Sequence, residues 1–193
     1  MVMVGQSHRR LWILLSTVAA LFIGVVVWLV VETTGTKEQR PRAVEDTTTK
    51  VVTASDGGST VSVPSKWAQM PESLQVSGAV IAQAQIYQER YLMVVSDEKA
   101  DFKDFADYEE TALISVEGLG GTATGQPEPI EVGGRPAVRY ELTGEFEGNG
   151  IVYWCTVVDG PRAYHQILTW TLADRRDQAE PALRTVTDSF REK

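Results

Sequence analysis

The sequence contains one cysteine, Cys155, and two histidines among 193 residues. A single thiol excludes an internal disulfide framework and a zinc site of the usual cysteine-rich kind. His165 is the only histidine outside the amino-terminal tail, and neither a Gly-x-Ser-x-Gly nor a His-Glu-x-x-His motif occurs. General acid–base catalysis would therefore have to rest on carboxylates, and we predict a non-catalytic protein without cofactor or metal.

Positive charge is scarce after the first 50 residues. Residues 51–193 hold 12 Lys and Arg against 22 Asp and Glu, a net charge of -10. A domain of that charge repels phosphates, so nucleic acid is excluded as a general partner. The mean hydropathy of -0.13 is too low for a polytopic membrane protein.

One long apolar run covers residues 11–31, LWILLSTVAALFIGVVVWLVV, and carries no charge. As a helix, 21 residues at about 1.5 Å each span a hydrocarbon core of about 30 Å. Trp12 and Trp28 lie near the ends of the run, where indole rings favour the headgroup region. We predict a transmembrane signal-anchor that contacts the lipid bilayer through residues 11–31. A cleaved secretory signal is the alternative, but its apolar region is shorter and is followed by small residues, whereas Ala19-Ala20 lie mid-run here.

The charges beside this run predict its orientation. Arg9 and Arg10 adjoin it directly, whereas basic and acidic residues are mixed on its other side. The basic residues next to the run and the short tail of residues 1–10 predict that the amino terminus is cytoplasmic. The carboxy-terminal domain is then extracytoplasmic and is attached to the cell membrane by a single pass. Residues 32–50 have almost no apolar side chains and predict a flexible polar linker. The folded domain is then residues 51–193.

Turn signals and hydrophobic periodicity in the domain predict a group of strands, the last three forming an antiparallel meander. The first predicted strands lie on both sides of the turn Asp56-Gly57-Gly58, and the second of them, through Thr60–Val63, ends at Pro64. Two further strands, Ala79–Tyr87 and Tyr91–Val95, are linked by Glu89-Arg90. The three strands of the meander are Pro136–Phe146, Ile151–Val158 and Arg162–Thr171, and the turns between them are Gly148-Asn149-Gly150 and Asp159-Gly160-Pro161. Because Ile151–Val158 is apolar on both alternating faces, we expect cover on both faces of the sheet.

Two helices are predicted from apolar residues at three- and four-residue spacing. The first carries Phe102, Phe105, Tyr108, Ala112, Leu113 and Val116, and the second carries Ala179, Leu183, Val186 and Phe190. Asp101 is the expected N-cap of the first helix, which ends at Gly118–Gly121. Asp174 or Asp177 is expected to cap the second, with Pro181 in its first turn or at a kink. Together these elements predict an α+β fold, a central antiparallel β-sheet with helices packed on both sides, preceded by a single transmembrane helix.

Four short stretches carry a resemblance to a known family. They are Val61-Ser62-Val63-Pro64-Ser65-Lys66-Trp67, Asp101-Phe102-Lys103-Asp104-Phe105, the hairpin from Pro127-Glu128-Pro129-Ile130 to Gly134-Arg135-Pro136-Ala137, and Asp188-Ser189-Phe190. Their order and spacing resemble the PsbP-like fold superfamily, whose bacterial members include LpqN-type envelope lipoproteins. The resemblance covers about residues 60–190. It implies a central antiparallel sheet with helices on both sides, a leaning toward the cell envelope, and no shared catalytic residues. The lipid-carrying cysteine of some members is absent here.

Three groups of residues are candidates for chemistry. If Asp159-Gly160-Pro161 is the whole turn, Cys155 faces His165 on the neighbouring strand and forms a thiolate–imidazole pair, although a one-residue shift destroys it. Acidic residues crowd the segment Asp97–Glu117 without the spacing of a calcium loop, so a solvated helix face is favoured. Five aromatic residues either line a carbohydrate or lipid site or pack in the core, which is the commoner role; they are Trp67, Trp154, Trp170, Tyr140 and Tyr153.

The leading hypothesis is a membrane-anchored, non-catalytic binding or scaffold module of a bacterial cell envelope. Its expected partner outside the membrane is an envelope protein or an apolar ligand. The alternative is a carrier or sensor of lipid or cell-wall glycan with an aromatic-lined groove. A Cys155/His165 enzyme and a structural subunit of a membrane complex are further hypotheses.

Overall fold

The computed structural model describes residues 48–72, 75–146 and 148–193. The predicted transmembrane segment, residues 11–31, and nearly all of the predicted linker lie outside the described residues. Within the described part of the chain, no helix is long and apolar enough to cross a bilayer. The first strand, β1 (Thr49–Thr53), begins two residues before the predicted start of the domain at Val51.

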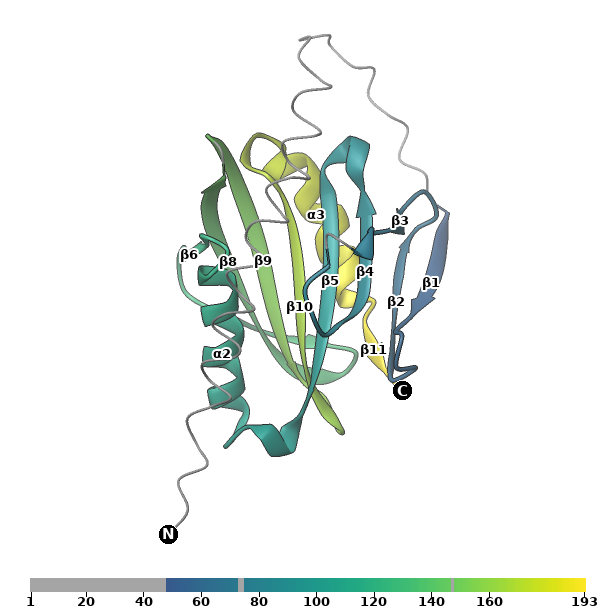
Figure 1. The fold of residues 1–193 in the computed structure, drawn as a ribbon, viewed down its shortest axis with the longest axis vertical. Helices are drawn as coiled ribbons and strands as arrows, with labels where there is room; N and C mark the ends of the chain where they lie inside the picture. The colour runs from purple at the N-terminus through teal and green to yellow at the C-terminus, as the bar shows by residue number, and fades with distance from the viewer. Residues whose placement is uncertain (1–47, 73–74, 147) are drawn as a thin grey trace, which may run out of the picture.

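The domain is a mainly antiparallel α+β structure built on two sheets (Figure 1). The larger sheet has the strand order β3-β4-β5-β10-β9-β8-β6, with β7 paired to β8. Its strands are β3 (Ala68–Gln69), β4 (Ala79–Gln85), β5 (Arg90–Glu98), β6 (Thr122–Ala123), β7 (Glu128–Val132), β8 (Arg135–Phe146), β9 (Asn149–Asp159) and β10 (Ala163–Leu172). The smaller sheet joins β1 and β2 (Ser59–Pro64) to the carboxy-terminal β11 (Arg191–Glu192).

The predicted meander is present as β8, β9 and β10, and β2 ends at Pro64 as expected. Two predicted connections are different. Of the predicted link Glu89-Arg90, only Glu89 lies between β4 and β5: Arg90 is the first residue of β5, and the 3-10 turn η2 (Ile86–Gln88) forms the rest of the reversal. Between β8 and β9, Asn149 and Gly150 are strand residues and not turn residues.

One face of the larger sheet is covered by helix α2 (Phe105–Glu117), which contacts β9 and β10 and is seen in front of the sheet on the left of Figure 1. Its buried residues are Tyr108, Ala112 and Val116. The helix ends at Gly118–Gly121 as predicted, with Gly120 in the left-handed region. Asp101 is not its N-cap: a 3-10 turn, η3 (Lys99–Asp101), precedes it, and the Asp104 carboxylate accepts from the backbone N–H of Asp107.

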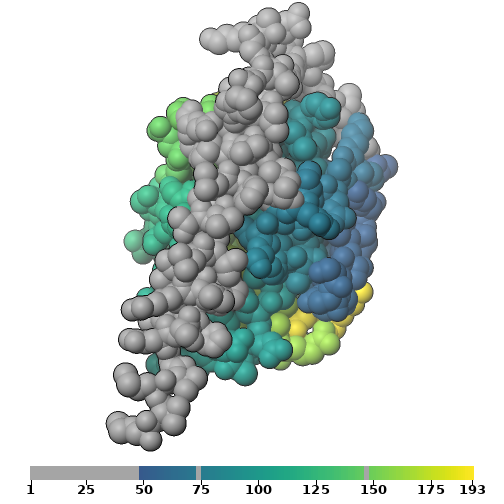
Figure 2. All heavy atoms as spheres, in the orientation of Figure 1, coloured from purple at the N-terminus to yellow at the C-terminus, as the bar shows by residue number. Residues whose placement is uncertain are grey.

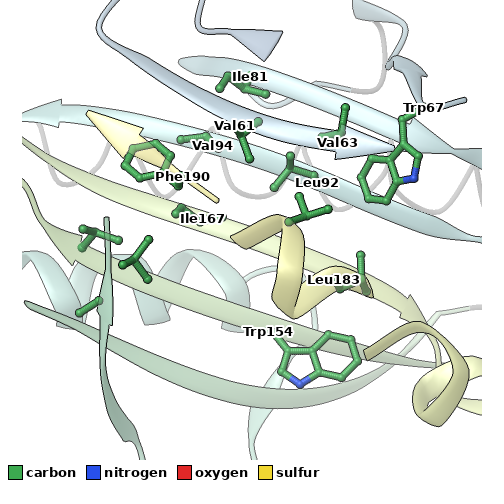
Figure 3. Close-up of a cluster of buried hydrophobic side chains, with 14 of the residues drawn as sticks. Val61, Val63, Trp67, Ile81, Leu92, Val94, Trp154, Ile167, Leu183 and Phe190 are labelled. Carbon is green, nitrogen blue, oxygen red and sulfur yellow. The ribbon is translucent and has the colours of Figure 1, made fainter. Parts of the chain in front are cut away.

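The opposite face is covered by helix α3 (Arg176–Asp188) and by the smaller sheet. Leu183 and Val186 of α3 pack in one cluster with Val61 and Val63 of β2 and with Phe190, which follows the helix (Figure 3). Neither Asp174 nor Asp177 caps α3, because the 3-10 turn η4 (Ala173–Arg175) runs directly into it and Arg175 takes the N-cap place. Pro181 is inside the helix, at its sixth residue, beyond the first turn.

Strand β9 lies between the two cores. Residues 151–158 are all buried, Tyr153, Cys155 and Val157 against the α2 face and Val152, Trp154 and Val158 against the other. The expectation of cover on both faces is therefore confirmed. The run is apolar on both faces because each face is removed from water by a different element.

Candidate functional site

Cys155 and His165 do not face each other. Strand β9 continues to Asp159 and β10 begins at Ala163, so Cys155 pairs with Leu168 and His165 pairs with Val158. The register differs from the prediction by three residues, and an odd shift places the two side chains on opposite faces of the sheet. Cys155 lies on the α2 face, fully buried, where burial raises the pKa of its thiol to about 12. A nucleophilic thiolate–imidazole pair is thereby excluded.

On the other face, His165 lies in a polar cluster that we call the β10–β11 cluster, composed of Ser96, His165 and Glu192. The Oγ of Ser96 lies 2.8 Å from Nδ1 of His165, and Oε2 of Glu192 lies 3.4 Å from Nε2. The side chains of His165 and Glu192 are only 3% and 5% exposed. The three residues are far apart in the sequence, and spacing alone gives no signal of their contact.

Strand pairing explains how the cluster forms. Ser96 and His165 are direct partners across β5 and β10. Glu192 arrives on β11, which is paired to β2 with Glu192 opposite Ser59. The backbone N–H of Lys193 donates to the Gly58 carbonyl, so the chain end lies beside the turn between β1 and β2, as Figure 1 marks it; in Figure 2, yellow atoms of the carboxy-terminal segment adjoin the blue atoms of the smaller sheet. The cluster therefore fastens the carboxy-terminal strand and the smaller sheet to the larger one.

The electrostatics of the cluster favour a neutral imidazole. Burial lowers the pKa of His165 below its ordinary value, and nearby Glu192 and Asp56 oppose the shift only in part. A carboxylate can only accept, so the compatible neutral tautomer carries its hydrogen on Nε2, toward Glu192. Ser96 then donates its hydroxyl hydrogen to Nδ1. Glu192 is also held through Oε1, which accepts from the backbone N–H of Arg162 at 3.1 Å.

The residue types are those of a serine hydrolase triad, and the Glu192 side of the cluster is closed by a loop. The loop between β9 and β10 packs directly on the cluster. A Cβ added to Gly160 would collide with Oε2 of Glu192 and lie 2.9 Å from Nε2 of His165. On this side, the cluster is a close contact between the loop and strands β10 and β11, while Ser96 of β5 is half-buried.

The acidic segment makes local structural contacts. Asp104 caps α2, Asp107 accepts from the backbone N–H of Lys103, and Asp97 accepts from the Tyr108 hydroxyl at 3.1 Å. Burial raises the pKa of Asp97, and the bond from Tyr108 opposes that shift. Among the described residues, no group of three or more potential ligands is placed to hold a metal ion.

Four of the five candidate aromatic residues are core residues. Trp67, Trp154, Trp170 and Tyr153 are each no more than 3% exposed, and Tyr140 is half-buried. Trp67 and Trp154 point into the cluster drawn in Figure 3. Trp170 stacks on Tyr91 with ring centroids 5.1 Å apart. Packed in this way, these rings do not line an open groove for lipid or glycan.

No model of a known protein family and no curated protein matches the sequence. Solved structures do match. Cyanobacterial PsbP (CyanoP) from Synechocystis sp. PCC 6803 gives a TM-score of 0.58 at 16% identity, over 80% of this chain and 98% of that one. LpqN of Mycobacterium tuberculosis gives 0.53 at 17% identity, over 74% and 89%. The chain has a PsbP-like fold. At these identities the likeness concerns the fold and carries no activity with it.

Two of the resembling stretches have a clear structural reason in this PsbP-like domain. The hairpin between β7 and β8 turns at Gly133 and Gly134, which both have positive φ, as a tight two-residue turn requires. A Cβ on Gly133 would also lie 2.9 Å from the carbonyl oxygen of Phe190. In Asp188-Ser189-Phe190, the Ser189 hydroxyl accepts from the N–H of Ser62 at 2.9 Å, which joins the end of α3 to β2.

Sequence reasoning missed one surface feature of the PsbP-like domain. The predicted strand Ala79–Tyr87 ends at Gln85, and Ile86 and Tyr87 form the reversal η2 instead. Both side chains are exposed, Ile86 at 39% and Tyr87 at 87%. An adjacent exposed pair is unusual here, because the other exposed large apolar residues among those described, Val51 and Ile114, lie on different elements.

Proposed function

We propose that this protein is a membrane-anchored, non-catalytic binding or scaffold module that works outside the cytoplasmic membrane, in a bacterial cell envelope. The observation that carries the proposal is the burial of Cys155 and His165, the cysteine and histidine of the domain. Cys155 is buried and carries a raised pKa, and the loop containing Gly160 packs on His165 and Glu192. A compact domain whose cysteine and histidine are buried is suited to binding other molecules through its surface.

The likeness to LpqN supports the envelope setting. LpqN is described as involved in cell envelope biogenesis of Mycobacterium tuberculosis. Residues 11–31 supply the proposed anchor, and residues 32–50 supply a polar tether. A bound envelope protein is the partner that we favour, since the aromatic side chains are used in the core and leave no lined groove for a lipid or glycan carrier.

The anchor is tested with the full-length chain in cells. We expect it to stay with the membrane during alkaline carbonate extraction, and a carboxy-terminal epitope to be removed by protease added to intact spheroplasts. A variant with Leu21→Arg and Val25→Arg places two charges in the apolar run and is expected to be released by carbonate. Release of the unaltered chain, or complete protection of its epitope, would overturn the anchored arrangement.

The absence of catalysis is tested with reactive probes on the native full-length chain. We expect iodoacetamide to modify Cys155 only after denaturation and a fluorophosphonate to leave Ser96 unmodified. The Ser96→Ala variant is the matched control for the second probe. Labelling of the native chain by fluorophosphonate that disappears in Ser96→Ala would show an active serine and contradict the proposal.

A further inference from the structure

The reversal between β4 and β5, which we call the β4–β5 tip, presents Ile86 and Tyr87 to the outside. Contacts made by Glu89 hold the tip in place. Glu89 has a positive φ of 55°, unusual for a residue other than glycine, and its backbone N–H donates to the Ile86 carbonyl at 3.0 Å. Its carboxylate lies 3.4 Å from Nε of Arg175, in η4.

A second contact holds the base of the tip. The Arg90 guanidinium donates to the backbone carbonyl of Gln178 in α3 at 3.2 Å. The two exposed side chains therefore stand on a turn that is connected to the start of α3 at both Glu89 and Arg90. Because the turn is fixed before any contact, little ordering entropy is lost when its side chains are buried by a partner.

The tip lies at the end of the domain where the chain enters. The carbonyl of Thr48 accepts from the N–H of Ser65, and Lys50 donates to the carbonyl of Trp67. The strand that follows Trp67 pairs Ala68 with Ala84, two residues before Ile86. In Figure 1 the start of β1 and the turn between β4 and β5 are both at the upper end, and the carboxy terminus is at the lower end.

The length of chain before Thr48 limits how far this end can be from a membrane. Sixteen residues separate Val31, the last residue of the predicted anchor, from Thr48. A flexible chain of that length has a root-mean-square span of about 22 Å, less than the size of the domain. With the proposed anchor, the end carrying the tip is the end nearest to the bilayer.

We propose that Ile86 and Tyr87 dock on the lipid bilayer and insert into its interfacial region, a contact that rests on the proposed anchor. Tyrosine favours this region because its ring is apolar and its hydroxyl stays hydrated, while isoleucine gains by leaving water. Two side chains bind a bilayer weakly on their own. A short tether raises the effective concentration to the millimolar range, so a weak contact is populated.

Fluorescence quenching in reconstituted vesicles tests the insertion. The full-length Tyr87→Cys chain is labelled with an environment-sensitive fluorophore and placed in phosphatidylcholine vesicles that contain lipids brominated near the headgroup. Lys103→Cys is the matched control, since its side chain is 86% exposed and follows η3 at the other end of the domain. Buried Cys155 remains unlabelled in both. We expect bromine to remove most of the fluorescence at position 87 and to leave that at 103 unchanged.

The outcomes separate failure of the insertion from failure of the anchor. Chains that resist carbonate extraction but show equal, weak quenching at positions 87 and 103 would overturn the insertion and leave the anchor intact. Chains released by carbonate would overturn both. Shielding of the probe at position 87 from aqueous iodide, without quenching by brominated lipid, would identify a protein cover and also overturn the insertion.

A second measurement leaves the tip without a label. Energy transfer from a fluorophore at Lys103→Cys to a lipid dye reports how far the domain stands from the vesicle surface. The pair Ile86→Ser and Tyr87→Ser, both exposed positions, is expected to change this transfer efficiency while the domain stays folded. Unchanged transfer in the folded double variant would overturn the insertion.

Discussion

The two faces of the larger sheet are closed in different ways. On the α2 face, one helix covers the sheet through apolar and aromatic contacts, among them Tyr108 stacked on Tyr164 with ring centroids 5.1 Å apart. On the α3 face, the cover is assembled from α3 and from both ends of the folded domain, β1–β2 and β11. Polar contacts join these pieces: Arg139 lies 2.7 Å from Asp188, and His165 lies 3.4 Å from Glu192.

Both faces combine apolar packing with buried polar contacts; on the α2 face, the Gln166 side chain donates to the Ala112 carbonyl at 3.0 Å. A face covered by segments distant in the sequence also needs contacts that define how those segments are joined. Buried polar groups serve this purpose because each requires a particular partner. Single substitutions in the polar contacts of the α3 face should therefore weaken the attachment of these segments to the larger sheet.

The largest expected effect is a loss of core packing on the α3 face. Leu183→Ala removes a fully buried side chain and is expected to lower the free energy of unfolding by about 2–5 kcal/mol. Urea denaturation followed by tryptophan fluorescence measures it. Ile114→Ala, at a half-exposed position of α2, is the control and is expected to cost about 1 kcal/mol or less. Equal losses in the two variants would contradict the placement of these side chains.

A smaller effect is expected where the β9–β10 loop closes the polar cluster. Gly160→Ala adds a methyl group against Glu192 and His165 and is expected to cost about 1–3 kcal/mol. In Gly58→Ala, the added atom meets only the flexible Asp56 side chain, at 3.3 Å or more, so a smaller loss is expected. Urea midpoints of the two variants measure the difference. If Gly160→Ala were as stable as the parent chain, the loop would not pack on the cluster.

The smallest effect is expected from titration of His165. Its pKa is lower in the folded chain than in the unfolded one, so the unfolded chain takes up the proton first as the pH falls. The free energy of unfolding therefore decreases from about pH 6.5 downward, by at most about 1.4 kcal/mol per pH unit, until the folded chain is protonated too.

Urea denaturation at pH 7.5 and pH 5.5 tests this titration. The fall in stability between the two pH values is expected to be smaller in His165→Gln than in the parent chain. The variant retains a polar side chain beside Ser96 and Glu192 but cannot titrate. An identical fall in both chains would show that groups other than His165 produce the pH dependence.

Local patterns predicted the elements well. Helical spacing placed α2 and α3, and Pro64 marked the end of β2, because these signals act within a few residues. The caps were predicted wrongly at both helices. Each helix is preceded by a 3-10 turn, which the helical spacing of apolar residues does not reveal. Phe102, counted as helical, is extended and packs edge-on against Tyr108, at 4.8 Å.

Local sequence patterns could not predict the candidate site. Cys155 and His165 were paired by assuming the shortest turn, and three additional residues in the β9–β10 register moved them to opposite faces. The partners of His165 are separated from it by about 70 residues on one side and about 30 on the other. Only the pairing of β10 with β5 and of β11 with β2 brings these residues together.

By itself, the sequence determined the acidic charge of residues 51–193, the apolar run 11–31, the order of the main strands and helices, and the resemblance to PsbP-like proteins. The tertiary structure alone decided the strand register, the closure of the His165 cluster and the exposure of Ile86 and Tyr87. The physical reason is the distance along the chain over which each signal acts. Periodicity and turn chemistry act between neighbours along the chain, whereas burial and strand pairing depend on segments that meet only when the whole domain is folded.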